Sequence, residues 1–152
     1  MSTIPFTTRR QILTLLGLSP LLLAPPALAA PATLGFPELY GKISVLGLEF
    51  SAKVRELDGK DVVMSGFMAP PLKAEATFFV LTEIPMSICP FCSSDSDWPD
   101  NIVVIYLDEK QTFVQPGTRI EVSGRLEMGS WTDQETGFLS RLRLRDARYW
   151  VV

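Results

Sequence analysis

Apolar and polar residues alternate along three segments of this chain, residues 61–68, 118–128 and 138–152. A period of two places successive side chains on opposite faces of an extended backbone, so it is typical of strands with one buried face. The spacing of three and four residues that marks an amphipathic helix is almost absent. The pattern therefore predicts an all-β protein.

The last of these segments carries an unusual pattern of charge. Leu142 and Leu144 alternate with Arg141, Arg143 and Arg145, and Arg148 follows. We expect Arg141, Arg143 and Arg145 to share one face of the sheet. Such a face could bind an acidic ligand, but a solvated outer face is the interpretation that we favour.

Two further segments, residues 76–81 and 102–107, are continuously apolar instead of alternating. Short runs of this kind, rich in β-branched and aromatic residues, are typical of strands that are covered on both faces. We expect both of them in the centre of the fold.

Two glycines mark a predicted turn and a predicted bend in these strands. Asp58-Gly59 stands between residues 50–57 and 61–68 and predicts a hairpin, because Asp-Gly favours the tight turn that joins two antiparallel strands. Gly124 lies inside an alternating segment, where a bulge or sharp bend is expected.

About five such strands, one of them long and bent at a glycine, favour a small antiparallel OB-like Greek-key barrel. A β-sandwich is the alternative. We assign residues 50–152 to the barrel and residues 30–49 to an N-terminal tether. The side chains expected in the core are Val62, Phe67, Phe79, Val103, Ile105, Ile120, Val122 and Leu144.

Residues 1–29 have the features of an export signal. Arg9 and Arg10 precede an apolar run, and Ala27-Leu28-Ala29 matches a cleavage site, so the mature chain is expected to begin near Ala30. The paired arginines also resemble the twin-arginine signal, and this route and the general secretory route both stay open. We expect a periplasmic protein with no transmembrane segment after the signal is removed.

The charge balance excludes one class of ligand. The chain has 14 basic and 17 acidic residues, and loss of Arg9 and Arg10 would leave 12 basic residues and a net charge near −5. Nucleic-acid binders depend on clustered lysines and arginines. We therefore expect no nucleic-acid partner.

The chemistry-bearing residues gather in one loop, residues 89–101. Cys89 and Cys92 are the only cysteines, and Asp95 and Asp97 follow them. In an exported protein, thiols this close tend to oxidise, so a Cys89–Cys92 disulfide that shapes the loop is the first interpretation.

A metal site is the second interpretation. Cys89, Cys92, Asp95 and Asp97 could bind zinc, or the thiolates could bind copper with Met86. The chain has no histidine, which removes a leading metal ligand and the commonest general base.

A thiol-disulfide oxidoreductase is the third interpretation. The aspartates that follow Cys92 would raise a thiol pKa, which works against it. The chain also lacks paired carboxylates, a phosphate loop or a nucleophile–base pair at a catalytic spacing. We expect no enzyme and no resident cofactor.

Several short motifs resemble a family of small exported bacterial proteins defined only as a domain of unknown function. The shared motifs are Asp58-Gly59-Lys60, the segment VVMSGFMAP at residues 62–70, the apolar strand at 78–81, the thiol loop and Pro99-Asp100-Asn101. The resemblance covers roughly residues 50–107. It implies a partner in the cell envelope, such as a component of an ABC transporter, because such genes and metal-handling genes often lie beside those of the family.

The function that we expect is therefore a non-catalytic binding or accessory module of the cell envelope. Its partner-binding residues would be Pro90, Phe91, Trp98 and Asn101, all in the thiol loop.

Overall fold

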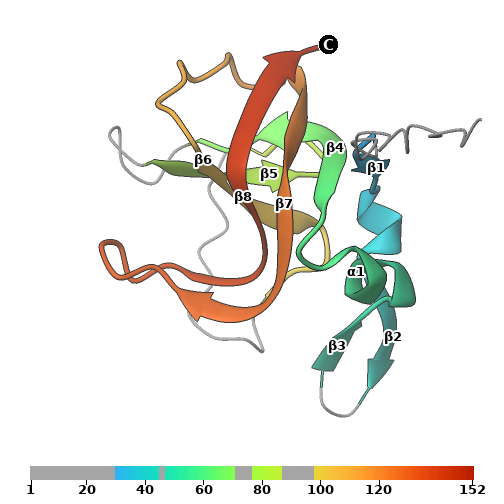
Figure 1. The fold of residues 1–152 in the computed structure, drawn as a ribbon. Helices are drawn as coiled ribbons and strands as arrows, with labels where there is room; N and C mark the ends of the chain where they lie inside the picture. The colour runs from blue at the N-terminus through green and yellow to red at the C-terminus, as the bar shows by residue number, and fades with distance from the viewer. Residues whose placement is uncertain (1–29, 45–46, 71–76, 87–97) are drawn as a thin grey trace, which may run out of the picture.

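The computed structural model describes residues 30–44, 47–70, 77–86 and 98–152. Strands dominate it, with one short α-helix and one 3-10 turn (Figure 1). In chain order the elements are β1 (Ala32–Thr33), η1 (Phe36–Glu38), β2 (Tyr40–Ser44), β3 (Gly47–Phe50), α1 (Ala52–Leu57), β4 (Asp61–Met68), β5 (Phe78–Thr82), β6 (Ile102–Leu107), β7 (Arg119–Thr132) and β8 (Leu139–Val151).

Five strands close into a barrel in the order β4-β5-β6-β8-β7, and β7 pairs back onto β4. All neighbours are antiparallel except β6 and β8, which run parallel. A closed ring with one parallel pair is the expected OB-like barrel and not an open sandwich. The prediction of the fold class is confirmed.

β5 and β6 are buried along nearly their whole length, as their continuous apolar runs predict. One face of this pair points into the barrel. The other is covered by the β7–β8 ribbon, which reaches beyond the barrel in Figure 1. Phe78 on β5 packs against Phe138 with ring centroids 5.4 Å apart, and Tyr106 on β6 meets Trp131 at 5.3 Å. The barrel therefore has a second, smaller apolar layer outside its core.

Seven of the eight predicted core residues are buried, and Phe67 is the exception. On β4 the buried side chains include Val62, Met64 and Met68, whereas Phe67 lies half-buried on the opposite face. Val62 and Phe67 are an odd number of residues apart, so a strand cannot place both on one face. The prediction for Phe67 was wrong for that reason.

The predicted irregularity at Gly124 is present. The pairing of β7 with β8 shifts between Ser123 and Arg125, where β8 contains one extra residue. Asp146 in that stretch has a positive φ of 51°. A Cβ on Gly124 would lie 2.9 Å from the Ala147 Cβ, so the close approach of the two strands requires glycine.

The prediction of a hairpin around Asp58-Gly59 is wrong for the segment that precedes the turn. Residues 52–57 form helix α1 instead of a strand, and Ser51 caps it by accepting a hydrogen bond from the Val54 amide at 3.1 Å. Val54 and Leu57 are buried, one helical turn apart. Gly59 still makes the turn with a positive φ of 76°, but it joins a helix to β4.

The segment predicted as a tether carries regular structure. β1 pairs in parallel with β4, and β2 and β3 form a separate two-stranded sheet. Leu34, Phe36 and Leu39 are buried, so this segment covers one end of the core. In the described ranges, no helix is long and apolar enough to cross a membrane.

Candidate functional site

The thiol loop leaves the barrel between β5 and β6, whose paired ends Thr82 and Ile102 lie side by side. The Glu83 amide donates to the Asn101 carbonyl at 3.2 Å and so closes the base of the loop. Asn101 is half-buried at this position. The two ends of the loop are therefore fixed next to each other by the sheet. The predicted site residues Cys89, Pro90, Phe91, Cys92, Asp95 and Asp97 lie outside the described residues.

Trp98 anchors the returning end of the loop. Its side chain is only 2% exposed, and its indole nitrogen donates to the Tyr40 hydroxyl at 2.6 Å. The Tyr40 ring in turn stacks on Phe50 with centroids 5.5 Å apart. The β2–β3 hairpin thus supports the loop from the side. Because its side chain is buried, Trp98 stabilises the base of the loop and contributes little to the exposed surface.

A hollow of about 330 Å³ adjoins this base. Its walls come from the N-terminal segment, including Phe36, Tyr40 and Leu48, and from the two ends of the loop at Glu83 and Asp100. The wall is therefore apolar and aromatic on one side and carries carboxylates on the other.

Next to Glu83, Ile84 exposes 59% of its surface. Isolated exposed apolar residues are ordinary. This one, however, lies directly at a loop base that is held by buried contacts, so it can contribute to a contact surface.

The second candidate region is the arginine face of β8. Arg141, Arg143 and Arg145 lie above the aromatic rings of Phe50, Trp131 and Tyr106, with guanidinium–ring distances of 5.4, 5.5 and 4.4 Å. The prediction of a shared face holds. The prediction of a solvated face is wrong for Arg143, which is only 8% exposed. The β7–β8 ribbon curls over the sheet, so Trp131 of β7 covers the guanidinium group of Arg143.

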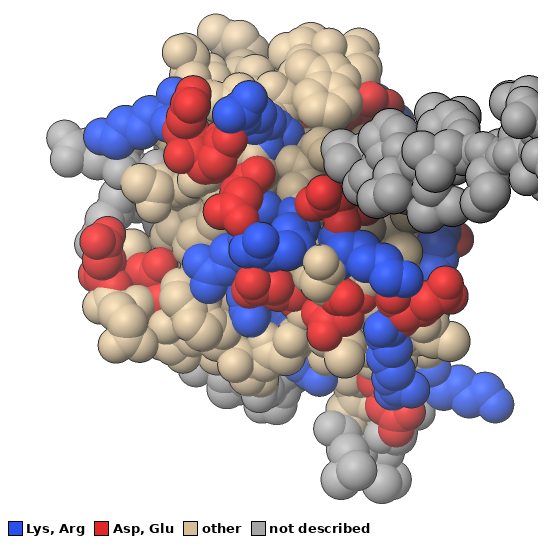
Figure 2. Space-filling model, viewed as in Figure 1, with Lys and Arg blue, Asp and Glu red and all other residues tan. Residues whose placement is uncertain are grey.

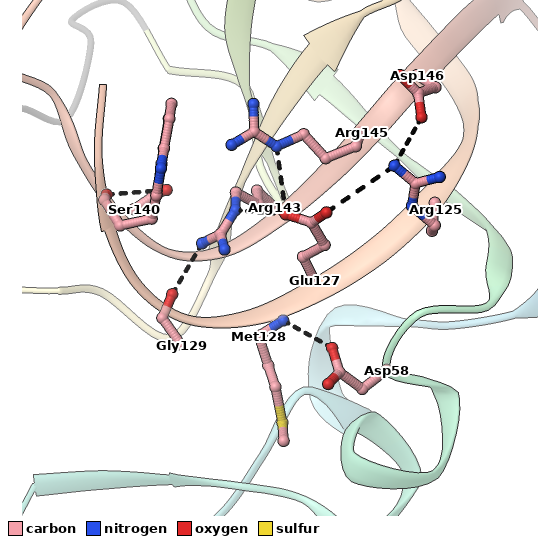
Figure 3. Close-up of polar contacts among 10 residues, drawn as sticks. Asp58, Arg125, Glu127, Met128, Gly129, Ser140, Arg143, Arg145 and Asp146 are labelled. Atoms are coloured by element: carbon pink, nitrogen blue, oxygen red, sulfur yellow. Dashed lines mark hydrogen bonds and ion pairs between the residues drawn. The ribbon is translucent and has the colours of Figure 1, made fainter. Parts of the chain in front are cut away.

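Glu127 holds two of these arginines together (Figure 3). Its Oε2 accepts hydrogen bonds from Nε of Arg143 at 3.0 Å and from Nε of Arg145 at 3.2 Å. Burial raises the pKa of Glu127, but the hydrogen bonds and charges of the two arginines outweigh burial, so the pKa is lowered overall. The carboxylate is thus charged at neutral pH and fixes both guanidinium groups.

A cavity of about 390 Å³ lies beside this cluster. It is lined by Tyr106, Trp131 and Arg145 and by the β7–β8 loop at Asp133, Gln134 and Glu135. The Tyr106 hydroxyl is buried and has no hydrogen-bond partner among the described residues. Burial, followed by the charge of Asp133, raises the pKa of Tyr106, so the phenol stays protonated.

Charge on the surface of the molecule is mixed. Figure 2 shows basic and acidic side chains interleaved across the face that carries β7 and β8. Several of these side chains form ion pairs, such as Arg125 with Asp146 at 2.8 Å and Arg148 with Asp108 at 2.5 Å. Among the described residues, this face has no extended basic patch of the kind that binds a polyanion.

Sequence reasoning did not find the Tyr40–Trp98 contact or the role of Glu127. Tyr40 and Trp98 are 58 residues apart, and no local pattern links them. The role of Glu127 could have been suspected from the sequence, because Glu127 lies in the alternating segment that precedes the arginine-rich strand and could pair with it. An acidic residue on the strand that pairs with three arginines suggests an ion-pair network. Within the parts of the chain that the structure describes, no group of three or more potential metal ligands is placed to hold an ion.

Comparison with known proteins gives a likeness of fold. No family model matches the chain, and no curated protein does. Among solved structures, a DUF3299 family protein from Pseudomonas aeruginosa PAO1 is similar, with a TM-score of 0.53 and 13% identity over 81% of this chain and 97% of that one. The chain thus shares its all-β fold with a member of a domain-of-unknown-function family.

Proposed function

We propose that this chain is an exported, non-catalytic binding module of the cell envelope, which engages a protein partner through the loop between β5 and β6. The observation that carries the proposal is the built base of that loop. Both ends are fixed, one by the pairing of Glu83 with Asn101 and the other by the buried Trp98 and its bond to Tyr40. A loop presented from a rigid base loses less conformational entropy when it binds a partner.

The surroundings of the base support this role. The exposed Ile84, the adjoining hollow and the carboxylates of Glu83 and Asp100 together offer apolar and polar contacts. Protein interfaces combine an apolar centre with a polar rim in this way. Export and the envelope partner rest on the signal-like residues 1–29 and on the family resemblance. A component of an ABC transporter is the first partner to test.

The chemistry of Cys89 and Cys92 decides between this function and its two alternatives. Protein isolated from the exporting compartment is assayed for free thiols, for bound zinc and copper, and for disulfide reductase activity. We expect an oxidised pair, no stoichiometric metal and no turnover, because an oxidised pair shapes a loop and has no thiolate to offer.

Two results would replace the proposal. One equivalent of zinc or copper that is lost in Cys89→Ser would make the chain a metal-handling protein. Turnover of a disulfide substrate that disappears in the same variant would make it a thiol-disulfide oxidoreductase. Ser94→Ala, in the same loop but without a thiol, is the matched control and is expected to behave as the wild type in all three assays.

A further inference from the structure

We infer that the cavity between Arg145 and the β7–β8 loop is a binding site for a neutral saccharide. This site is separate from the thiol loop. Thr77, which precedes β5, and Leu107, which ends β6, belong to the cavity wall. The thiol loop joins the opposite ends of the same two strands. The volume of about 390 Å³ lies within the range of small-molecule sites, about 300–1,000 Å³.

Arg145 is held in place by three contacts. Its Nε donates to Glu127 at 3.2 Å (Figure 3). Its guanidinium carbon lies 4.1 Å from the centre of the Trp131 ring and 4.4 Å from that of Tyr106. Among the described residues, Nε is the only guanidinium nitrogen of Arg145 with a hydrogen-bond partner. The two terminal amino groups are therefore pre-positioned donors for a ligand.

The opposite wall of the cavity is also rigid. Asp133 Oδ1 accepts hydrogen bonds from the Glu135 amide and from the amide and hydroxyl of Thr136 at 2.8–3.1 Å. The Gly137 amide donates to the Asp133 carbonyl at 2.8 Å and closes the turn. Gln134 and Glu135 project from this fixed loop and are exposed. The site is thus largely formed before any ligand arrives.

The charged residues of the lining disfavour ionic ligands. Asp133, Glu135 and Asp146 line the cavity together with one cation, Arg145, so an anion would meet several carboxylates. The same carboxylates would attract a cationic ligand, but the place over the two aromatic rings that a cation would take is already filled by the guanidinium group of Arg145. A neutral ligand remains.

A sugar ring fits the polar groups and the apolar surface of this cavity. Its hydroxyl groups both donate and accept, so they can pair with the amino groups of Arg145 and with the carboxylate and amide oxygens of Glu135 and Gln134. Arg145 covers the ring of the buried Tyr106, so the part of Trp131 that stays exposed in the cavity wall supplies the apolar surface for its C–H groups. OB-type barrels bind oligosaccharides or oligonucleotides on the face of their second and third strands, which are β5 and β6 here. Of these two ligand classes, the acidic lining favours the uncharged saccharide over the anionic oligonucleotide.

The test is a titration of the full folded domain with tri-N-acetylchitotriose and maltotriose, followed by backbone amide NMR. Spermine and an oligothymidylate serve as cationic and anionic probes. We expect at least one of the two saccharides to give saturable shifts at residues 133–137 and at Tyr106. We expect weaker or no binding of the charged probes.

Three variants make the result specific. Arg145→Lys keeps the charge but loses the planar pair of donors, and we expect Kd to rise about tenfold, as for the loss of one good hydrogen-bonded pair. Glu135→Gln lies on an exposed loop and does not threaten folding, and we expect a smaller rise. Arg148→Lys, further along β8 and not part of the cavity wall, is the matched control and should leave Kd unchanged.

The inference is overturned if neither saccharide shifts these amides, if a charged probe binds more tightly, or if the Arg145 and Glu135 variants bind like the wild type. None of these results depends on the thiol loop, so they are distinguishable from failure of the proposed function.

Discussion

Trp98 donates its indole N–H to the hydroxyl of Tyr40 across 2.6 Å, which joins the returning end of the thiol loop to the β2–β3 hairpin. Because Trp98 is buried, removal of the acceptor would leave its N–H without this bond. We therefore expect Tyr40→Phe to lower the free energy of unfolding by about 1–3 kcal/mol, measured by urea denaturation.

The matched control is Tyr106→Phe. This hydroxyl is buried without a hydrogen-bond partner among the described residues, so its removal should be neutral or slightly stabilising. Equal losses in the two variants would show that the Tyr40 hydroxyl has no special role at the loop base.

Face assignment on the strands is tested by two phenylalanines. Phe79 on β5 is buried in the core, and we expect Phe79→Ala to cost about 3–5 kcal/mol. Phe67 on β4 is half-buried on the other face, where Arg119 lies 6.0 Å from its ring centre, so Phe67→Ala should cost clearly less. If Phe67→Ala cost as much as Phe79→Ala in the same denaturation experiment, the assignment of faces on β4 would be wrong.

The close approach at Gly124 is a further test of the barrel. A Cβ there would lie 2.9 Å from both the Ala147 Cβ and the Arg145 carbonyl oxygen. We expect Gly124→Ala to destabilise the protein by about 1–3 kcal/mol through overpacking. Gly41→Ala is the control, because the nearest atom to its added Cβ would lie at 3.8 Å. Its unfolding free energy should stay within about 0.5 kcal/mol of wild type.

Stability at acid pH reports on Glu127. Its pKa is lower in the folded chain than its ordinary value of 4.5, so it stabilises the fold above that pH. This contribution is lost as pH falls through the folded pKa. We expect wild-type stability to decline below about pH 4.5, and Glu127→Gln to be less stable at neutral pH but to decline less on acidification.

The melting temperature of both proteins between pH 7 and pH 3 measures this effect. Glu135→Gln, on the exposed loop, should keep the wild-type dependence on pH. Identical acid profiles for the wild type and Glu127→Gln would show that the contacts with Arg143 and Arg145 do not stabilise the charged carboxylate.

The barrel strands could be predicted from sequence because their patterns are local. Alternation marked β4, β7 and β8, and continuous apolar runs marked β5 and β6. The bulge at Gly124 followed from one glycine within an alternating strand. Helix α1 was missed because six residues hold too few turns for a helical period to stand out from a loose alternation. Its cap at Ser51 was the available signal.

The sites were less predictable because they depend on contacts between distant residues. Arg143 was expected to be solvated, since strand alternation assigns a side chain to a face but does not say what covers that face. Trp131, on the strand that pairs with β8, covers it here. The cavity beside Arg145 likewise combines residues from β6, β7, the β7–β8 loop and β8, and no sequence motif connects them.

The central claim, that the loop between β5 and β6 engages a partner, is tested most directly by photo-crosslinking in exporting cells. A photoreactive amino acid replaces exposed Ile84 at the loop base, or exposed Lys110 beyond the opposite end of β6 as the control. We expect a discrete adduct with one envelope protein from position 84 and none from position 110. The adduct should disappear when residues 87–97 are replaced by a Gly-Ser linker of equal length in a domain that still folds. No adduct at position 84, or equal adducts at both positions, would contradict the account.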